Sequence, residues 1–187
     1  MKGFTLIETM VAVTILTIAI SGALFIANSA IIAALVSRDQ LTASYLAQEG
    51  IEYVRLMRDN EYLVSYHAGG TSVSLTAWTN FITGSDAASI TQCRTTACML
   101  DPTQSMGSGS GLSLKPCSGS ACTPLYLANG VYTERSDISG SVETPFTRTI
   151  QVTDISANDE RVVSTVSWSF HAVPYSVSII NHLSPWQ

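Results

Sequence analysis

Charged side chains are absent from one long stretch near the start of the chain. Residues 9–37, a run of 29, contain no Asp, Glu, Lys or Arg and consist mainly of Val, Ile, Leu and Ala. As an α-helix, which rises ~1.5 Å per residue, this run would span about 43 Å and exceed the ~30 Å hydrocarbon core of a bilayer. The pattern predicts a membrane-spanning helix, with membrane lipid as its first expected partner.

Apolar positions keep helical spacing after this run ends. A stripe of small and apolar side chains recurs every three or four residues, while Arg38, Glu52 and Arg55 lie off it. The members of the stripe are Ala43, Leu46, Ala47, Gly50, Ile51, Val54 and Met57. The spacing predicts one continuous helix over residues 5–60, whose second part lays the stripe on a folded domain.

From Leu63 onward, β-type patterns replace helical spacing. Asn129-Gly130 separates two short apolar runs and favours the type I′ turn of a β-hairpin. Three later runs alternate apolar and polar residues and predict an antiparallel meander with one buried face. The inward positions are Phe146, Ile150 and Val152, then Val162, Val166, Trp168 and Phe170, then Tyr175, Val177 and Ile179. Residues 64–123 predict loops with short strands, or a small helix near residues 78–81. The expected fold class is α+β, with a long N-terminal helix packed on a C-terminal antiparallel sheet.

Composition and charge narrow the expected partners. The 187 residues are 46% hydrophobic and 12% charged, whereas about 25% is typical of soluble domains. The net charge is −5, and from Glu61 onward five basic and nine acidic side chains are scattered singly. Binding to nucleic-acid phosphates needs a clustered basic face, so we expect no nucleic-acid partner.

Glu8 is the ionisable side chain at the start of the apolar run. A carboxylate in such a place is costly, and it predicts a functional role with a specific partner. The simpler alternative is a plain signal anchor that holds Glu8 at the level of the lipid headgroups. Ala27-Asn28-Ser29 could also serve as a signal-peptidase site, although the apolar run is about twice as long as that of a secretory signal.

The first residues resemble a known export signal. Gly3-Phe4-Thr5-Leu6-Ile7-Glu8, followed by the long apolar run, is similar to the class III signal of type IV pilins and type II secretion pseudopilins. The resemblance implies that prepilin peptidase cuts between Gly3 and Phe4 and N-methylates Phe4. It also implies other pilin or pseudopilin subunits and an inner-membrane assembly platform as partners. The expected location is the bacterial inner membrane, as a single-pass protein with its C-terminal domain exported, and then a pilus at the cell surface or a periplasmic pseudopilus.

The spacing between Gly3 and Glu8 has a physical rationale. Cleavage removes Lys2 and leaves a cationic amine on Phe4. That amine and the Glu8 carboxylate are each costly in an apolar environment, where their mutual attraction is strong. Glu8 is therefore the candidate for charge pairing between neighbouring subunits, and head-to-tail repetition of this contact builds an open filament.

These expectations divide the chain into four parts: a leader (1–3), a transmembrane and filament-core helix (4–37), an amphipathic helix (38–62) and an exported β-rich domain (63–187). Residues 48–52, 146–150, 165–168 and 183–186 are similar to PilV-like minor pilins. The expected function is that of a structural minor pilin, with a type II secretion pseudopilin as the alternative. A single-pass anchored binding or adhesion domain is a second alternative. The sequence contains no recognised catalytic motif, so we expect neither an enzyme nor a cofactor.

Four cysteines form two units in the loop region 93–122: Cys93-x4-Cys98 and Cys117-x4-Cys122. An exported domain favours disulfides over a zinc site, which prefers two-residue spacings. Nested pairing would join Cys93 to Cys122 and Cys98 to Cys117, whereas local pairing would join the two members of each unit. The sequence leaves both pairings open.

One acidic turn is a candidate for Ca²⁺. Asp154, Asn158, Asp159 and Glu160 gather between two predicted strands and offer the oxygen ligands that Ca²⁺ prefers. No EF-hand spacing is present, and a solvated turn is the simpler interpretation.

Overall fold

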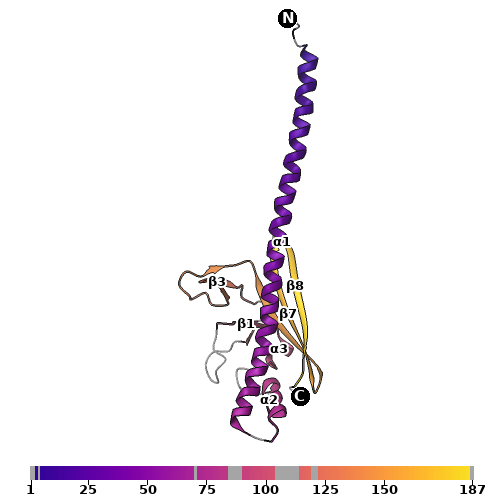
Figure 1. The fold of residues 1–187 in the computed structure, drawn as a ribbon. Coiled ribbons are helices and arrows are strands. Elements are labelled where there is room, and N and C mark those ends of the chain that lie inside the picture. Colours follow the sequence, from indigo (N-terminus) through magenta and orange to yellow (C-terminus); the bar gives the residue numbers. More distant parts are fainter. Residues whose placement is uncertain are drawn as a thin grey trace. The chain divides into compact units, whose positions relative to one another are not determined.

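The computed structural model describes residues 3, 5–69, 71–83, 90–103, 114–118 and 122–185. The chain forms two compact units, Met1–Leu41 and Thr42–Gln187, called unit 1 and unit 2 below. Helix α1 (Leu6–Ala68) contributes residues to both units (Figure 1). The predicted α+β layout, a long apolar N-terminal helix packed on C-terminal antiparallel strands, is confirmed.

Helix α1 continues past the predicted end near residue 60 and stops at Ala68. No proline interrupts residues 6–68. The helix ends where Gly69 adopts a left-handed φ of 74° and donates its N–H to the Tyr66 carbonyl at 3.2 Å. A glycine in this conformation is the most common helix C-terminal signal, because a side chain would be strained there. The amphipathic stripe ends at Met57, but the stop signal lies further along the chain.

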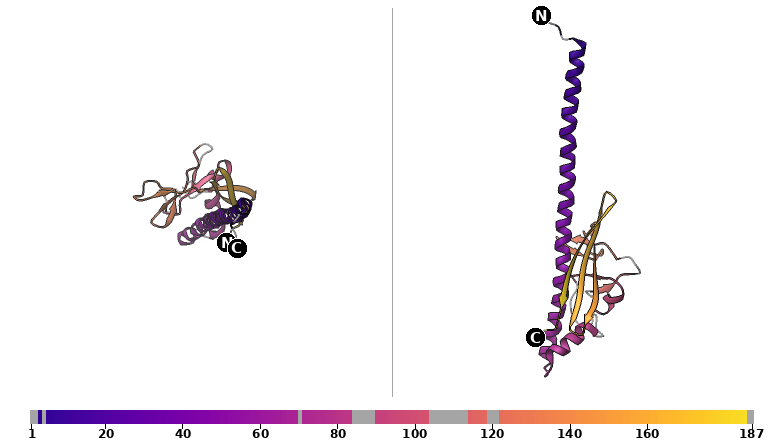
Figure 2. Two further views of the ribbon diagram at one scale, coloured as in Figure 1. Left: turned by 90° about the horizontal axis from the view of Figure 1, so that it is seen from above. Right: turned by 90° about the vertical axis from the view of Figure 1, so that its right-hand side faces the viewer.

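The main sheet of unit 2 has five antiparallel strands in the order β2-β1-β6-β7-β8. Its centre is the predicted meander of three long strands: β6 (Thr147–Ser156), β7 (Asp159–Phe170) and β8 (Val173–Leu183). The short strands β1 (Cys98–Leu100) and β2 (Leu114–Pro116) extend it on the side of β6. Figure 2 shows the long strands running beside the part of α1 that belongs to unit 2.

A second, three-stranded sheet has the order β4-β3-β5. It contains the predicted hairpin of β3 (Tyr126–Ala128) and β4 (Val131–Thr133), with β5 (Val142–Glu143) on the other side of β3. In the turn, Asn129 and Gly130 have φ values of 52° and 82°. Two positive φ angles define the type I′ turn that matches the twist of a hairpin.

The core of unit 2 lies between the α1 stripe and the inner face of the long strands. Two clusters of buried side chains follow one another along the helix. The first contains Ala43, Leu46, Ala47, Leu125, Phe146, Val166 and Trp168. The second contains Ile51, Val54 and Met57 with Ile150, Val152, Val162 and Leu183, among others. Because successive helix positions meet successive strand positions, α1 and β7 run in opposite directions.

Two further helices cover the second cluster. Helix α2 (Val73–Thr83) buries Trp78 and Phe81 and is the short helix expected near residues 78–81. The Trp78 indole N–H donates to the Ala157 carbonyl at 2.9 Å, which fixes α2 to the turn between β6 and β7. Helix α3 (Gln92–Thr95) is a single turn that leads into β1.

Candidate functional site

The start of α1 carries the candidate assembly signal. Gly3 is exposed, and a Cβ built on it would meet nothing within 4 Å. Phe4, the expected site of cleavage and N-methylation, lies outside the described residues. Thr5 precedes the helix, and its carbonyl accepts hydrogen bonds from the N–H groups of Glu8 at 3.1 Å and Thr9 at 3.3 Å. The helix therefore starts at Leu6, three residues after Gly3.

Glu8 lies in the first turn of α1, where Thr5-Leu6-Ile7-Glu8 has the spacing of a capping box. The Glu8 N–H reaches the Thr5 hydroxyl oxygen at 3.4 Å. A carboxylate here is favoured by the positive end of the helix dipole, in addition to any partner in another subunit. Glu8 therefore combines helix initiation with an exposed negative charge, a local role that the sequence reasoning missed although the capping spacing could have indicated it.

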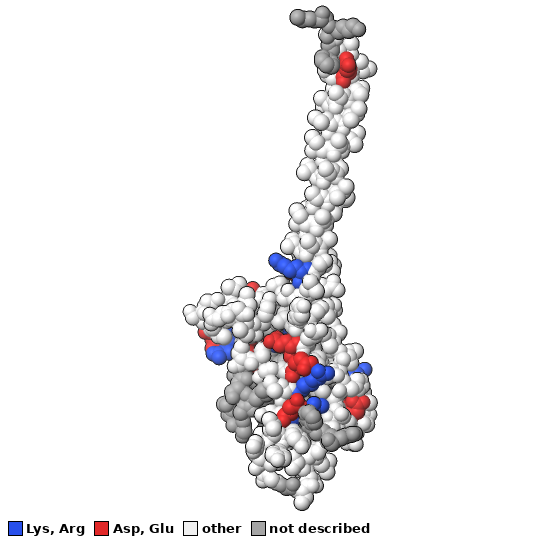
Figure 3. Space-filling view, viewed as in Figure 1, with Lys and Arg blue, Asp and Glu red and all other residues white. Residues whose placement is uncertain are grey.

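The rest of the helix in unit 1 presents an apolar surface. The large apolar side chains from Leu6 to Ile31 are exposed in this chain by itself, and Figure 3 shows an uncharged surface along the helix after Glu8, up to Arg38. Five hydroxyl groups in this part donate to carbonyls of the preceding turn. These bonds join Thr9 to Leu6, Thr14 to Val11, Thr17 to Thr14, Ser21 to Thr17 and Ser37 to Ala33, at 2.7–2.9 Å.

Internal satisfaction of these hydroxyls makes the helix compatible with hydrocarbon, where an unpaired polar group is costly. By length and composition, α1 is able to cross a membrane. The same surface suits close packing of several such helices, because Gly22 bears no side chain and a Cβ at that position would meet nothing within 4 Å in the single chain.

Arg148 fixes α1 to the sheet in unit 2. Its guanidinium is fully buried and donates to the Leu46 carbonyl of α1 at 3.3 Å and to the Leu100 carbonyl of β1 at 2.7 Å. It also pairs with the Glu49 carboxylate at 2.6 Å. A buried charge is tolerated only when it is paired and hydrogen-bonded, so this arrangement ties three segments to one orientation. Sequence reasoning missed Arg148, although its place between the inward positions Phe146 and Ile150 signals burial.

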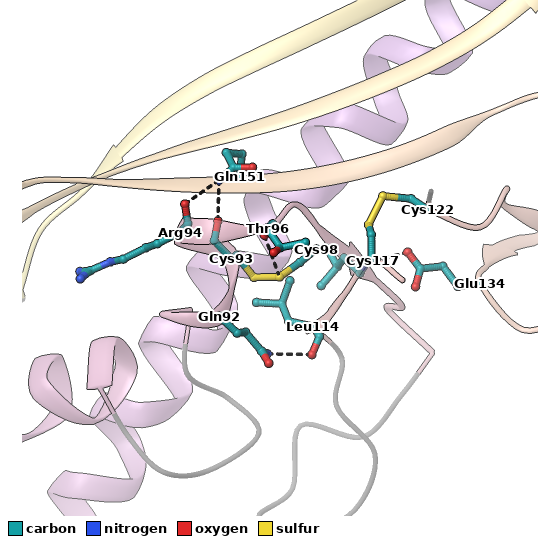
Figure 4. The surroundings of a disulfide bond; sticks show 11 residues. Gln92, Cys93, Arg94, Thr96, Cys98, Leu114, Cys117, Cys122, Glu134 and Gln151 are labelled. Atoms are coloured by element: carbon teal, nitrogen blue, oxygen red, sulfur yellow. Dashed lines mark hydrogen bonds between the residues drawn. A yellow bond between two sulfur atoms is a disulfide. The ribbon is translucent and has the colours of Figure 1, made fainter. Parts of the chain in front are cut away.

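The structure pairs the cysteines locally, as Cys93–Cys98 and Cys117–Cys122. The first disulfide links α3 to β1 in the core, where both cysteines are fully buried. Figure 4 shows Gln151 above it, and the Gln151 amide donates to the Cys93 carbonyl at 2.9 Å. Of the two pairings left open by the sequence, the nested one is not formed.

Glu134 connects the second sheet to the main one. Its Oε1 accepts a hydrogen bond from the Leu100 N–H at 2.6 Å. Burial raises the pKa of Glu134 from 4.5 to about 7, with Asp101 adding to the rise, while the Leu100 hydrogen bond and the positive charges of Arg148 and Lys115 oppose it. Sequence reasoning did not single out this residue, and an isolated Glu after a short strand carries no pattern that could have identified it.

The four Ca²⁺ candidates do not converge on one point. Glu160 is buried and pairs with Arg94, whose guanidinium also lies 3.6 Å from Asp154. Asp159 instead faces His182, with its carboxylate oxygens 2.9 and 3.0 Å from Nδ1. The Asn158 N–H reaches the Ser156 hydroxyl at 3.4 Å. Because Arg94 already pairs with Glu160 and lies close to Asp154, these two carboxylates are not free to bind a cation.

Other side chains that could bind a metal ion do not form a cluster in the described residues either. Across the parts of the chain that the structure describes, no group of three or more His, Cys, Asp or Glu residues could hold a metal ion. The features described above lie in the N-terminal signal and in the contacts between α1 and the sheet within unit 2.

Comparison with known proteins supports the export signal expected at the start of the chain. Residues 1–24 match the family model of the prokaryotic N-terminal methylation motif. No curated protein sequence and no solved structure matches the chain. The match covers the leader, Phe4, Glu8 and the first part of the apolar run, and leaves unit 2 unassigned. The chain thus carries at its start a signal of the type IV pilin-like prepilin kind, and this motif supports a substrate of prepilin peptidase.

Proposed function

We propose that this protein is a structural minor pilin. In this proposal it is inserted in the bacterial inner membrane, cut between Gly3 and Phe4 and N-methylated on Phe4 by prepilin peptidase. It is then assembled with other pilin subunits into a type IV pilus-like filament. The observation that carries the proposal is the methylation motif at residues 1–24, placed on a helix whose apolar side chains are exposed in the single chain.

Assembly would bury that exposed surface. About 25 cal/mol is gained per Å² of apolar surface removed from water, but a helix leaving lipid for a filament gains mainly through close packing and specific polar contacts. Glu8 supplies such a contact, because its carboxylate is exposed in the first helical turn. Pairing it with the new amine of a neighbouring Phe4 neutralises two charges that are costly apart.

Unit 2 would be the exported and displayed part of the subunit. Within unit 2, the Arg148 contacts hold the sheet to α1, and the disulfides suit an oxidising compartment. A protein with the methylation motif is typically structural, and we assign no catalytic step to this chain.

A type II secretion pseudopilin is the second candidate, because the same motif precedes pseudopilins. The two candidates differ in where the filament ends: at the cell surface for a pilus and in the periplasm for a pseudopilus.

Fractionation of the producing bacterium tests the proposal. Filaments sheared from the cell surface should contain the processed protein, and a strain that lacks prepilin peptidase should keep all of it in the membrane fraction. Loss of enzyme secretion on deletion of the gene, with the protein confined to the envelope, would favour the pseudopilin. Presence of an unprocessed chain in a strain with active peptidase would overturn both candidates and leave an anchored binding domain.

A further inference from the structure

The main sheet of unit 2 ends in one long strand. In the order β2-β1-β6-β7-β8, the 11-residue strand β8 lies at an edge, and Figure 1 shows it on the opposite side of unit 2 from β1. Its pairing with β7 runs from Val173 to Leu183 without a register shift. Among the described strands β8 pairs with β7 alone, so a row of its backbone N–H and C=O groups faces away from the sheet. This edge offers the hydrogen bonds that a further strand needs.

The other sheet edges in the described chain are short. Strand β2 has three residues and ends in Lys115 and Pro116, a charge and a residue without an N–H. Strand β4 also has three residues, and β5 has two, of which Glu143 is charged. Short length, charge and proline are usual means by which proteins keep an edge from pairing. In contrast, β8 is long and contains no Asp, Glu, Lys or Arg.

Pro174 limits where the β8 edge can pair. It is the second residue of the strand and lacks the N–H that a ladder of hydrogen bonds requires. Residues 175–183 remain available, and they exceed the length of an average strand, about five to six residues. The edge is therefore long enough to pair with a complete additional strand.

The core of unit 2 is incompletely covered along the same edge. On β7, the inward-facing Val162 and Val166 are buried. On β8, the inward-facing Tyr175, Val177 and Ile179 pack against the same two clusters but stay partly exposed. A strand beside β8 would cover these three side chains, and burial of apolar surface favours a partner whose own residues on that face are apolar.

The outer face of the edge has a different chemistry. The outward-facing Ser176 and Ser178 are exposed, and the Ser178 hydroxyl oxygen lies 2.8 Å from that of Thr165 on β7. Hydroxyl pairs of this kind stabilise neighbouring strands. A partner strand with Ser or Thr on its outer face would continue the row. The edge therefore matches an uncharged segment that alternates apolar residues with Ser or Thr.

A second copy of β8 matches this pattern poorly. If residues 175–183 of two copies paired antiparallel over their full length, Asn181 of each copy would lie opposite Val177 of the other. Asn181 faces inward, because it pairs with the buried Val162. An amide buried opposite an apolar residue lacks a hydrogen-bond partner, which is costly. A segment with its own alternation avoids this mismatch.

We propose that β8 binds an additional strand, an extended and uncharged segment of another protein that alternates apolar and hydroxyl residues. Backbone hydrogen bonds to residues 175–183 provide the affinity, and the apolar side chains of the segment cover Tyr175, Val177 and Ile179. The inference goes beyond the proposed function, because it concerns unit 2 by itself and does not depend on processing at Gly3 or on membrane anchoring.

Amide hydrogen exchange followed by NMR tests the strand pairing. The probe is a synthetic peptide that copies residues 162–170 of β7, a strand of this chain with the required alternation. It is added to the full chain with its disulfides intact, in detergent micelles. Because alternate amides of an edge strand point away from its neighbour, we expect every second amide of residues 175–183 to exchange roughly tenfold or more slowly when the peptide is bound.

A peptide of the same composition, with its apolar residues grouped at one end, is the control. We expect it to leave the exchange of β8 unchanged. No slowing with the alternating peptide, or equal slowing with both peptides, would contradict strand pairing. A chain that dimerises without peptide, with the same alternate amides protected, would make a second copy the occupant and overturn the proposed partner.

Two lysine variants locate the binding surface. Val177→Lys places a charge on the inner face of the available edge, whereas Val173→Lys places the same charge on the same face of β8 but beyond Pro174. Because an added strand would bury the ammonium group at position 177, we expect Val177→Lys to weaken binding of the fluorescently labelled peptide about tenfold or more, measured by anisotropy. Val173→Lys should bind like the parent protein. Equal binding by the two variants would contradict pairing along this edge.

Discussion

Gly50 lies where α1 approaches the sheet so closely that a side chain has no room. A Cβ at this position would lie 2.5 Å from the Ser164 hydroxyl oxygen and 3.1 Å from Cδ1 of Ile150. The residue is on the apolar stripe of the helix, where a glycine usually costs helix stability, so its presence indicates that close approach matters more than propensity. The stripe predicted which face is buried, but the sequence did not show how closely the sheet approaches it.

Gly50→Ala should therefore destabilise unit 2. Alanine improves helix propensity by about 1 kcal/mol, whereas overpacking a core typically costs about 1–3 kcal/mol. We expect a net loss of stability, visible as a lower Tm of the full chain in detergent. Ser164→Ala in the same chain removes the nearest atom and should recover part of the loss. A Tm at or above that of the parent protein for Gly50→Ala alone would show that the helix and sheet can move apart freely.

Glu8 combines a helix-capping position with a charge, and the two can be separated by substitution. Glu8→Gln keeps a residue type suited to the capping box and removes the charge, while Glu8→Ala removes both. We expect both variants to remain in the membrane and to enter sheared filaments in much smaller amounts than the parent protein. Incorporation of Glu8→Gln at the parent level, with Glu8→Ala reduced, would assign the role to capping and contradict charge pairing.

At the scale of elements, Glu134 makes the attachment of the second sheet sensitive to pH. Its pKa is raised from 4.5 to about 7 in the fold, so the folded chain binds this proton more tightly than the unfolded chain. The stability that this group contributes is fully present below about pH 4.5 and is lost as the pH rises to about 7. Burial raises the pKa of Glu160 as well, which acts in the same direction.

We expect the free energy of unfolding to fall by about 1–3 kcal/mol from Glu134 alone between pH 4.5 and 7. Glu134→Gln keeps an acceptor for the Leu100 N–H and removes the titration. Denaturant unfolding at several pH values should therefore give a smaller fall for this variant and a higher stability at pH 7.5. Parallel pH profiles for the two proteins would show that Glu134 does not titrate in this range.

The two disulfides close loops of equal length, each with a sequence separation of five. Loop-closure entropy alone therefore predicts the same contribution from each, about 2 kcal/mol. The first lies in the core and the second at its margin, where Cys122 is partly exposed. Replacing Cys93 and Cys98 by Ala should lower the Tm more than replacing Cys117 and Cys122, because cavity formation adds to the loss. Equal decreases in Tm would show that burial of the Cys93–Cys98 disulfide adds nothing to the stability.

Periodicity predicted the elements that have strong repeats. The meander and the Asn129-Gly130 hairpin lie where alternation and turn residues placed them. The elements that were poorly predicted, α3, β1 and β2, are too short to show a period and are held by the disulfide and by pairing with β6. The role of Arg148 was missed because its acceptors lie in α1 and β1, far away in the sequence. Without them, burial of a charged residue at an inward position cannot be explained.

At the scale of the whole molecule, the main feature is the exposed apolar surface of unit 1. The large side chains from Leu6 to Ile31 are exposed in the single chain, and in the proposed function lipid or other helices surround them. A large exposed apolar surface marks an interaction site in soluble and membrane proteins alike. The methylation motif at residues 1–24 lies on this same surface, which connects processing at one end of the helix with its packing among partners.

Intact mass spectrometry of the protein from native membranes tests the central claim most directly. Processing by prepilin peptidase predicts a chain that lacks Met1-Lys2-Gly3 and carries one additional methyl group, on Phe4. Reduction should then add two hydrogens for each of the two disulfides. A mass equal to that of the full chain beginning at Met1, in cells with active peptidase, would contradict the prepilin account.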